Sequence, residues 1–87
     1  MQKTPEDFGN QDLALLYIAK RLKEALAIEK VLTDAGVDYL VEPDTYRGGI
    51  IFASERVGAF FYVPQEALDS AQDLLRQHGY KPNVEAP

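Results

Sequence analysis

The chain has 87 residues, no cysteine and a formal net charge of −5 at pH 7. A chain of this length forms one domain with a small core, which association between copies would help to stabilise. The absence of cysteine excludes disulfides, thiolate metal sites and a cysteine nucleophile, and the acidic balance argues against nucleic acid as a partner. Because no apolar signal core or membrane-length apolar run occurs, we expect a cytoplasmic protein that does not enter a membrane.

A strand, a helix and a second strand are predicted in the first half of the chain. Leu13–Ala19 is a run of seven apolar residues that switches abruptly to helical spacing, which favours a strand followed by a helix. Apolar residues then recur with a period of 3.6 over residues 20–35, and Gly36 can end this helix. Residues 37–42 alternate between apolar and polar, as in a partly exposed strand. Short joints between these elements predict a right-handed crossover with two parallel strands.

The second half of the chain predicts a loop, two strands and a helix. In chain order these are a loop at 43–48, strands at 49–54 and 58–63, and a helix at 65–78. Pro43 is expected to interrupt the preceding strand, and Gly58 to supply a positive φ to a hairpin joint. Pro64 is suited to open the last helix and Gly79 to end it, with Tyr80 placed for the accompanying apolar contact.

The predicted strands are apolar on both of their faces. In the run at residues 13–18, both alternating sets of side chains are apolar, and the same holds for residues 59–63. Two helices can cover only one face of a small sheet, so something else must cover the second face. We expect a partner copy of the chain to do so, in a homo-oligomer. The alternative is that the N-terminal tail and the strand at 50–54 fold over this face.

A candidate binding site is predicted where the first two strands end. The cations Lys20, Arg21 and Lys23 gather at the start of the first helix, where side chains and backbone can hold an anion. Parallel strands would bring the loop after Val41 to the same end of the sheet. The predicted ligand- or partner-binding residues are therefore Lys20, Arg21, Lys23, Thr45, Tyr46, Arg47, Gly48 and Gly49. The alternative is a solvated basic patch paired with Glu24 or Asp44.

Catalysis and metal binding have little support in the sequence. His78 is the only histidine, and no second histidine or cysteine accompanies it as a metal ligand. No serine lies in a nucleophile-elbow context, and no glycine-rich phosphate-binding motif occurs. We therefore expect no enzyme activity, no metal and no cofactor.

Several short motifs resemble a small bacterial family described as prokaryotic signal-transducing proteins. They are Tyr17-Ile18-Ala19, Glu24-Ala25, Ala35-Gly36-Val37 and, over residues 62–75, YVPQEALDSAQDLL. The family's biochemical function is not established, and its fold is similar to the ferredoxin-like domain of PII nitrogen-regulatory proteins. The resemblance implies a PII-like regulatory module, with residues 43–57 where PII proteins carry their partner-binding loop. No PII nucleotide-binding motif is present.

Together these observations predict an α+β fold. We expect a ferredoxin-like two-layer sandwich at residues 12–80, ordered βαβ(β)βα, with both helices on one face of a mostly antiparallel sheet. Residues 1–11 are expected to be a flexible tail in which Phe8 docks locally, and residues 81–87 a second tail. The strand at 59–63 is placed inside the sheet beside residues 13–18, and a 2-3-4-1 meander is the competing order. The predicted function is binding of a protein partner or small anionic effector, and the alternative is an oligomerising domain without a ligand.

Overall fold

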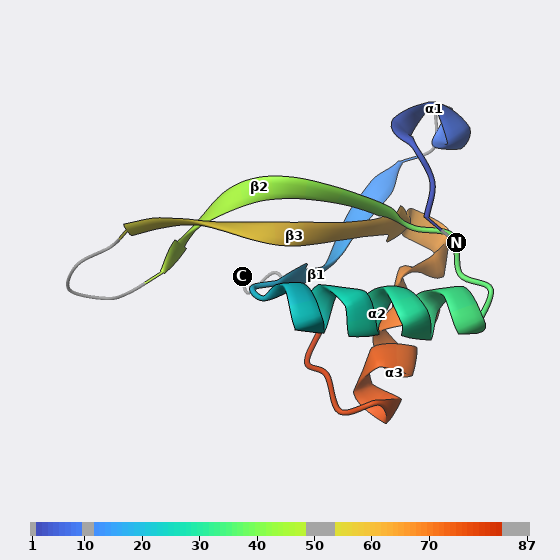
Figure 1. Cartoon of the computed structure of the whole chain (residues 1–87). Coiled ribbons are helices and arrows are strands. Elements are labelled where there is room, and N and C mark those ends of the chain that lie inside the picture. The colour runs from blue at the N-terminus through green and yellow to red at the C-terminus, as the bar shows by residue number, and fades with distance from the viewer. Residues whose placement is uncertain (1, 10–11, 49–53, 83–87) are drawn as a thin grey trace.

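A three-stranded antiparallel sheet forms the centre of the structure, a computed structural model that describes residues 2–9, 12–48 and 54–82. In chain order the elements are α1 (Pro5–Phe8), β1 (Leu13–Ala19), α2 (Leu22–Asp34), β2 (Leu40–Gly48), β3 (Ser54–Pro64), the 3₁₀ turn η1 (Gln65–Ala67) and α3 (Leu68–Gln77). The helices α2 and α3 lie on one face of the sheet (Figure 1). The predicted α+β class and the placement of both main helices on one face are confirmed.

The central strand is β3, with β1 on one side and β2 on the other. Both neighbours run antiparallel to it, with Ala19 opposite Ala59 and Leu40 opposite Tyr62. β1 and β2 are therefore parallel to each other, as predicted for the crossover through α2. The predicted interior position of residues 59–63 beside β1 is confirmed, and the meander order is wrong because β2 pairs directly with this segment.

Pro43 lies within β2 and does not interrupt it, so the predicted loop at 43–48 is wrong. It pairs in register with Ala59 of β3. A proline lacks the N–H that a ladder needs, and for that reason it is tolerated chiefly in edge strands. β2 is an edge strand in this sheet, so its outer side needs no partner for the missing N–H.

The predicted hairpin joint at residues 54–58 is also wrong. Gly58 lies inside β3 opposite Asp44, and its φ is not among the positive values found at Gly9, Gly36 and Gly79. β3 continues back to Ser54 as one strand, so residue 54 and residues 58–63 do not belong to separate strands. Residues 49–53, which hold the rest of the strand predicted at 49–54, lie outside the described residues.

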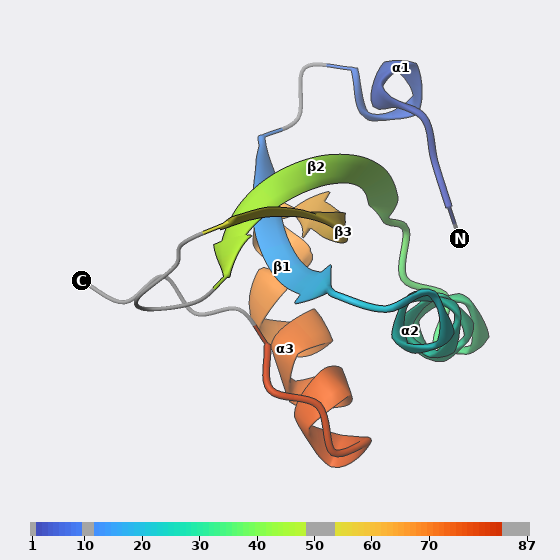
Figure 2. The same cartoon turned by 60° about the vertical axis from the view of Figure 1, so that its left-hand side comes forward.

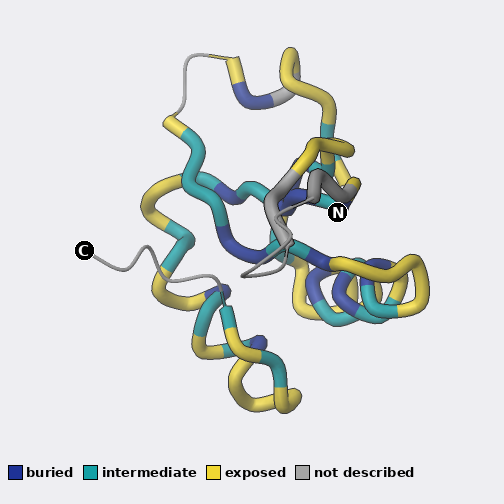
Figure 3. The backbone as a smooth tube through the Cα atoms, turned by 90° about the vertical axis from the view of Figure 1, so that its left-hand side faces the viewer, coloured by how far each residue is buried: buried dark blue, intermediate teal, exposed yellow. Residues whose placement is uncertain are grey.

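The core lies between the sheet and the two helices. Its largest fully buried side chains come from all these elements and are Leu16, Ile28, Leu32, Phe61, Val63 and Leu75. The buried stripe of α2 consists of Ala25, Ile28 and Leu32, which recur with the helical period predicted over residues 20–35. Figure 3 shows buried positions in the sheet and on both helices, with exposed positions alternating with them along each helix.

Both helices end as their glycines predict. Gly36 and Gly79 have φ values of 74° and 87°, in the left-handed region that glycine adopts without steric cost. After α3, the N–H of Tyr80 donates to the carbonyl of Leu75 at 2.9 Å, and the N–H of Gly79 donates to that of Arg76 at 3.0 Å. This pair of bonds is the Schellman motif, which satisfies carbonyls at the end of the helix.

The N-terminal segment lies on the side of the sheet opposite α2 and α3 (Figure 2). Phe8 at the end of α1 is buried, as the prediction of local docking requires. Gln2 forms a parallel bridge with Tyr39, and the N–H of Lys3 donates to the Tyr39 carbonyl at 2.7 Å. This segment thus supplies part of the cover that the alternative prediction assigned to it.

Candidate functional site

The junction between β1 and α2 is the centre of the candidate site. Arg21 is the N-cap residue of α2, with φ −135° and ψ 147°, and its side chain makes no capping hydrogen bond. Glu24, three residues on, performs part of that role from inside the helix. Its carboxylate accepts a hydrogen bond from the backbone N–H of Lys20 at 3.2 Å and another from the Tyr17 hydroxyl at 2.5 Å. These bonds fix the direction in which the helix leaves the strand.

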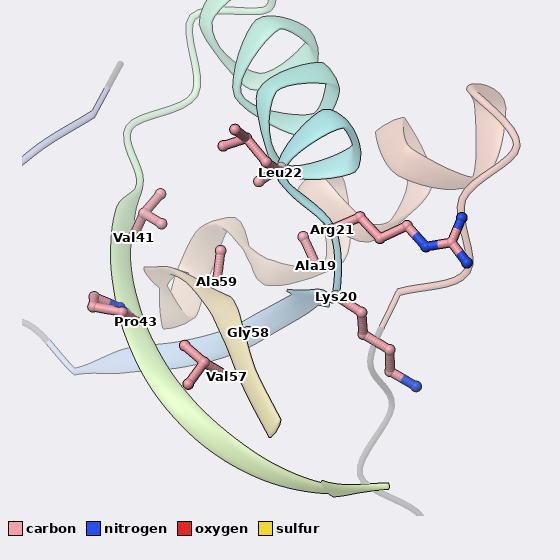
Figure 4. Close-up of a pocket in the computed structure, with 10 residues that line it drawn as sticks. Ala19, Lys20, Arg21, Leu22, Val41, Pro43, Val57, Gly58 and Ala59 are labelled. Carbon is pink, nitrogen blue, oxygen red and sulfur yellow. The ribbon is translucent and has the colours of Figure 1, made fainter. Parts of the chain in front are cut away.

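An apolar pocket of about 280 Å³ lies on one side of this junction. Residues from β1, from the start of α2 and from the β2–β3 ribbon line it, and they include Ala19, Leu22, Val41, Pro43, Val57 and Ala59. Leu22 and Val57 both line this pocket and keep 76% and 68% of their surface exposed. Figure 4 shows Val41, Pro43 and Val57 along the strand side of the pocket and Leu22 on the helix side.

A second pocket of about 470 Å³ lies at the same junction, and cations line it. Its residues are Lys20, Arg21, Lys23, Glu24, Ala27 and Tyr80. Lys20 and Arg21 line both pockets, but in Figure 4 their side chains extend away from Val41 and Pro43. The positive end of the α2 dipole adds to the potential of the three cations. Glu24 offsets one of these charges, so the lining of this pocket carries a net positive charge.

Two tyrosines support the wall of the basic pocket. The rings of Tyr17 and Tyr80 meet edge to face with centroids 6.0 Å apart, a favourable geometry for an aromatic pair. Burial, together with the hydrogen bond to Glu24, raises the pKa of Tyr17 well above its usual range. Tyr17 therefore stays neutral at physiological pH and acts as a hydrogen-bond donor that holds Glu24 in place.

The structure brings together only part of the predicted site. Lys20, Arg21 and Lys23, which were predicted to gather at the start of the first helix, line the basic pocket together. Thr45 is exposed on β2 opposite Val57 and lines neither pocket. Three more predicted residues, Tyr46, Arg47 and Gly48, lie further along β2, paired with Arg56, Glu55 and Ser54. Gly49 lies outside the described residues. Of the two carboxylates in the alternative prediction, Glu24 lines the basic pocket together with the cations, and Asp44 accepts the backbone N–H of Thr45 at 2.8 Å.

The apolar half of the site was not predicted. Leu22 lies off the buried stripe of its helix, and that displacement is the one signal in the sequence that could have pointed to it. Val57 was predicted to lie in a hairpin joint and Pro43 in a loop. Their positions in paired strands, which bring them to the pocket, were therefore not predicted. Tyr80 was expected only as the apolar contact after the second helix, but it also lines the basic pocket.

The described part of the chain has no obvious metal site. Among residues 2–9, 12–48 and 54–82, no group of three or more histidine, aspartate or glutamate side chains is arranged to hold a metal ion. No helix in these ranges is long and apolar enough to cross a membrane.

Comparisons of the chain with protein-family models, with curated proteins and with solved structures found no match. The resemblance to the PII-like signal-transducing family therefore stays a prediction.

Proposed function

We propose that this protein is a regulatory or signal-transducing module that binds an acidic partner segment at the start of α2. The observation that carries the proposal is the junction at Lys20 and Arg21, where an apolar pocket and a basic pocket adjoin. A partner segment with one apolar side chain beside acidic side chains would use both pockets at once. Neither catalysis nor a cofactor is part of this proposal.

The size and exposure of the apolar pocket favour a protein partner over a small molecule. At about 280 Å³ it lies at the small end of ligand pockets and suits a single apolar side chain. Leu22, Leu26 and Val57 are the large apolar residues that the described structure leaves exposed. Exposed apolar side chains beside a pocket are typical of contact sites for other proteins. A small anionic effector is the second candidate, favoured by the basic pocket alone.

The proposed relationship to the ferredoxin-like domain of PII proteins supports the same role in partner binding. The β-α-β-β-α order with β3 in the centre agrees with a ferredoxin-like core of the PII type. The family resemblance assigns partner binding to residues 43–57, and the two ends of this segment, Pro43 and Val57, line the apolar pocket. The ferredoxin-like and PII-like assignments belong to this proposal.

Titration of the ¹⁵N-labelled protein tests the proposal by amide chemical shifts. The probes are acidic peptides that carry one leucine or phenylalanine, with inorganic phosphate as the small anion. We expect shifts in residues 19–25 and 57–59, and we expect Arg21→Glu and Leu22→Ser each to weaken the best peptide at least about tenfold. Lys30→Glu is the matched control, because it makes the same charge change further along the exposed side of α2.

The outcomes separate the candidates. Shifts caused by phosphate and abolished by Arg21→Glu but not by Leu22→Ser would favour the small effector. If no probe moves these amides, or if Lys30→Glu weakens binding as much as Arg21→Glu does, the proposed site is wrong.

A further inference from the structure

The outer edge of β1 is open in the described structure. The sheet order β1-β3-β2 leaves one edge each on β1 and β2, and β1 pairs with β3 alone. The isolated bridge within residues 2–9, 12–48 and 54–82 joins Gln2 to Tyr39, away from β1. An edge strand presents a row of unpaired backbone N–H and C=O groups, which can template pairing with another strand.

The two edges differ in how they are protected. β2 carries Glu42, Pro43 and Asp44, and charged residues and proline on an edge strand oppose pairing. β1 has the sequence LALLYIA, without a charge, a proline or a glycine. A bulge is a further protective device, and β1 has one register shift, between Leu15 and Tyr17. Three residues on each side of this shift pair regularly with β3, so most of the strand keeps a regular edge.

We propose that a second copy of this chain pairs with this edge, β1 against β1 and antiparallel, about a twofold axis near Leu16. The charges at the two ends of β1 select this arrangement. Asp12 directly precedes the strand, and Lys20 and Arg21 directly follow it. All three are exposed. In the antiparallel pairing, Asp12 of each copy lies opposite the Lys20–Arg21 end of the other, whereas a parallel pairing would align like charges.

Twofold symmetry makes the contact self-complementary and closed. The same pair of opposite charges occurs at both ends, and two three-stranded sheets join into one continuous sheet. Leu15 and Ile18, paired with Tyr62 and Phe60 on the face away from α2 and α3, are half-buried in the single chain. Pairing at the edge places Leu15 of each copy next to Ile18 of the other. This dimer differs from the homo-oligomer predicted from the sequence, which would form through the face of the sheet.

Sedimentation equilibrium from micromolar to millimolar concentration tests this arrangement with the full chain. We expect a dimer of twice the 9.7 kDa chain mass. Asp12→Lys should raise the dimer dissociation constant at least about tenfold, because it places like charges opposite each other at both ends. Lys20→Glu and Arg21→Glu, combined with Asp12→Lys, should restore the dimer. Glu42→Lys makes the same change of charge on the β2 edge and should leave the dissociation constant unaltered.

Hydrogen exchange identifies which surface forms the contact. In the dimer, the outward amides of β1 should exchange more slowly with rising protein concentration, and those of β2 should not. A monomer at every concentration would overturn the proposal. So would a dimer that Asp12→Lys leaves intact, or one whose concentration-dependent protection lies outside β1.

Discussion

The two faces of the sheet differ in how they are covered. On the face toward α2 and α3, Phe61 and Val63 of β3 are fully buried in one continuous core. On the opposite face, Phe60 and Leu40 are nearly buried although they lie outside that core, while Tyr62 stays half-exposed. A short helix and its flanking residues provide the cover there, and Phe8 of α1 is buried. One face is thus closed by long amphipathic helices and the other by a short segment.

This difference indicates which parts of the sheet maintain stability and which can bind other molecules. Fully packed side chains cannot be removed without leaving a cavity, whereas a half-covered site can relax or admit water. We therefore expect stability to depend mainly on the helix-covered face. The opposite face and the edges of the sheet then tolerate change and remain available for contacts with other molecules.

The largest expected effect separates two adjacent phenylalanines of β3. Phe61→Ala should lower the free energy of unfolding by about 3–5 kcal/mol, because it empties a fully buried position in the core. Phe60→Ala, on the opposite face, should lower it by about 1.5–3 kcal/mol, the loss of apolar burial with less of a cavity. Urea titrations of both variants measure the difference. Equal losses would show that the two faces are equally well packed.

A second comparison lies along α2. Leu32 is fully buried against the sheet, whereas Leu26 keeps 57% of its surface exposed. Leu32→Ala should lower the free energy of unfolding by about 2–5 kcal/mol, and Leu26→Ala by less than about 0.5 kcal/mol. Thermal and urea unfolding measure both values. A larger loss for Leu26 would mean that α2 presents a different side to the core.

The two helices were predictable because their positions and ends depend on local signals. The 3.6 period at Ala25, Ile28 and Leu32 and the glycines at positions 36 and 79 specify the two helices and their ends. The run of β2 through Pro43 could not be read locally, because its tolerance depends on β2 being an edge strand. Gly58 is a similar case, since a glycine marks equally well a turn or a position inside a strand.

The candidate site likewise has one part that could be predicted from the sequence and one part that could not. Its cations were found because Lys20, Arg21 and Lys23 are neighbours in the sequence. The apolar pocket joins residues more than thirty positions apart, such as Leu22 and Val57, through strand pairing that the sequence did not reveal. The register of the β2–β3 pair brings the residues of this pocket together, so the pocket can be predicted only when that register is known.

The cover of the opposite face can be tested through its buried side chain. Phe8→Ala should lower the free energy of unfolding by about 1.5–3 kcal/mol if α1 is held on the sheet by burial. Phe8→Leu, which keeps most of the apolar surface, is the control and should lose less. Differential scanning calorimetry of the three proteins gives the values. An unchanged melting temperature for Phe8→Ala would show that α1 contributes nothing to the stability of this face.

The smallest expected effect compares one tyrosine on each face. Burial raises the pKa of Tyr17 on the helix side and that of Tyr62 on the opposite side, with Glu24 adding to the first and Asp44 and Glu42 to the second. Tyr17→Phe removes a hydrogen bond to Glu24 and should lower the free energy of unfolding by about 1 kcal/mol at pH 7. Tyr62 makes no side-chain hydrogen bond within the described residues, so Tyr62→Phe should be close to neutral.

The stability of the protein at alkaline pH distinguishes these two tyrosines from fully hydrated surface tyrosines. A tyrosine whose folded pKa lies above its unfolded value of 10.0 keeps its proton in the folded protein after the unfolded chain has lost it. Its stabilising contribution is therefore fully present below pH 10 and declines as pH rises beyond that value. The wild type should lose stability between pH 9 and pH 11, and each phenylalanine variant should lose less over the same range. Urea titrations at these pH values give the slope of the free energy of unfolding against pH. If neither substitution alters this slope, both hydroxyls are as well hydrated in the folded protein as in the unfolded chain.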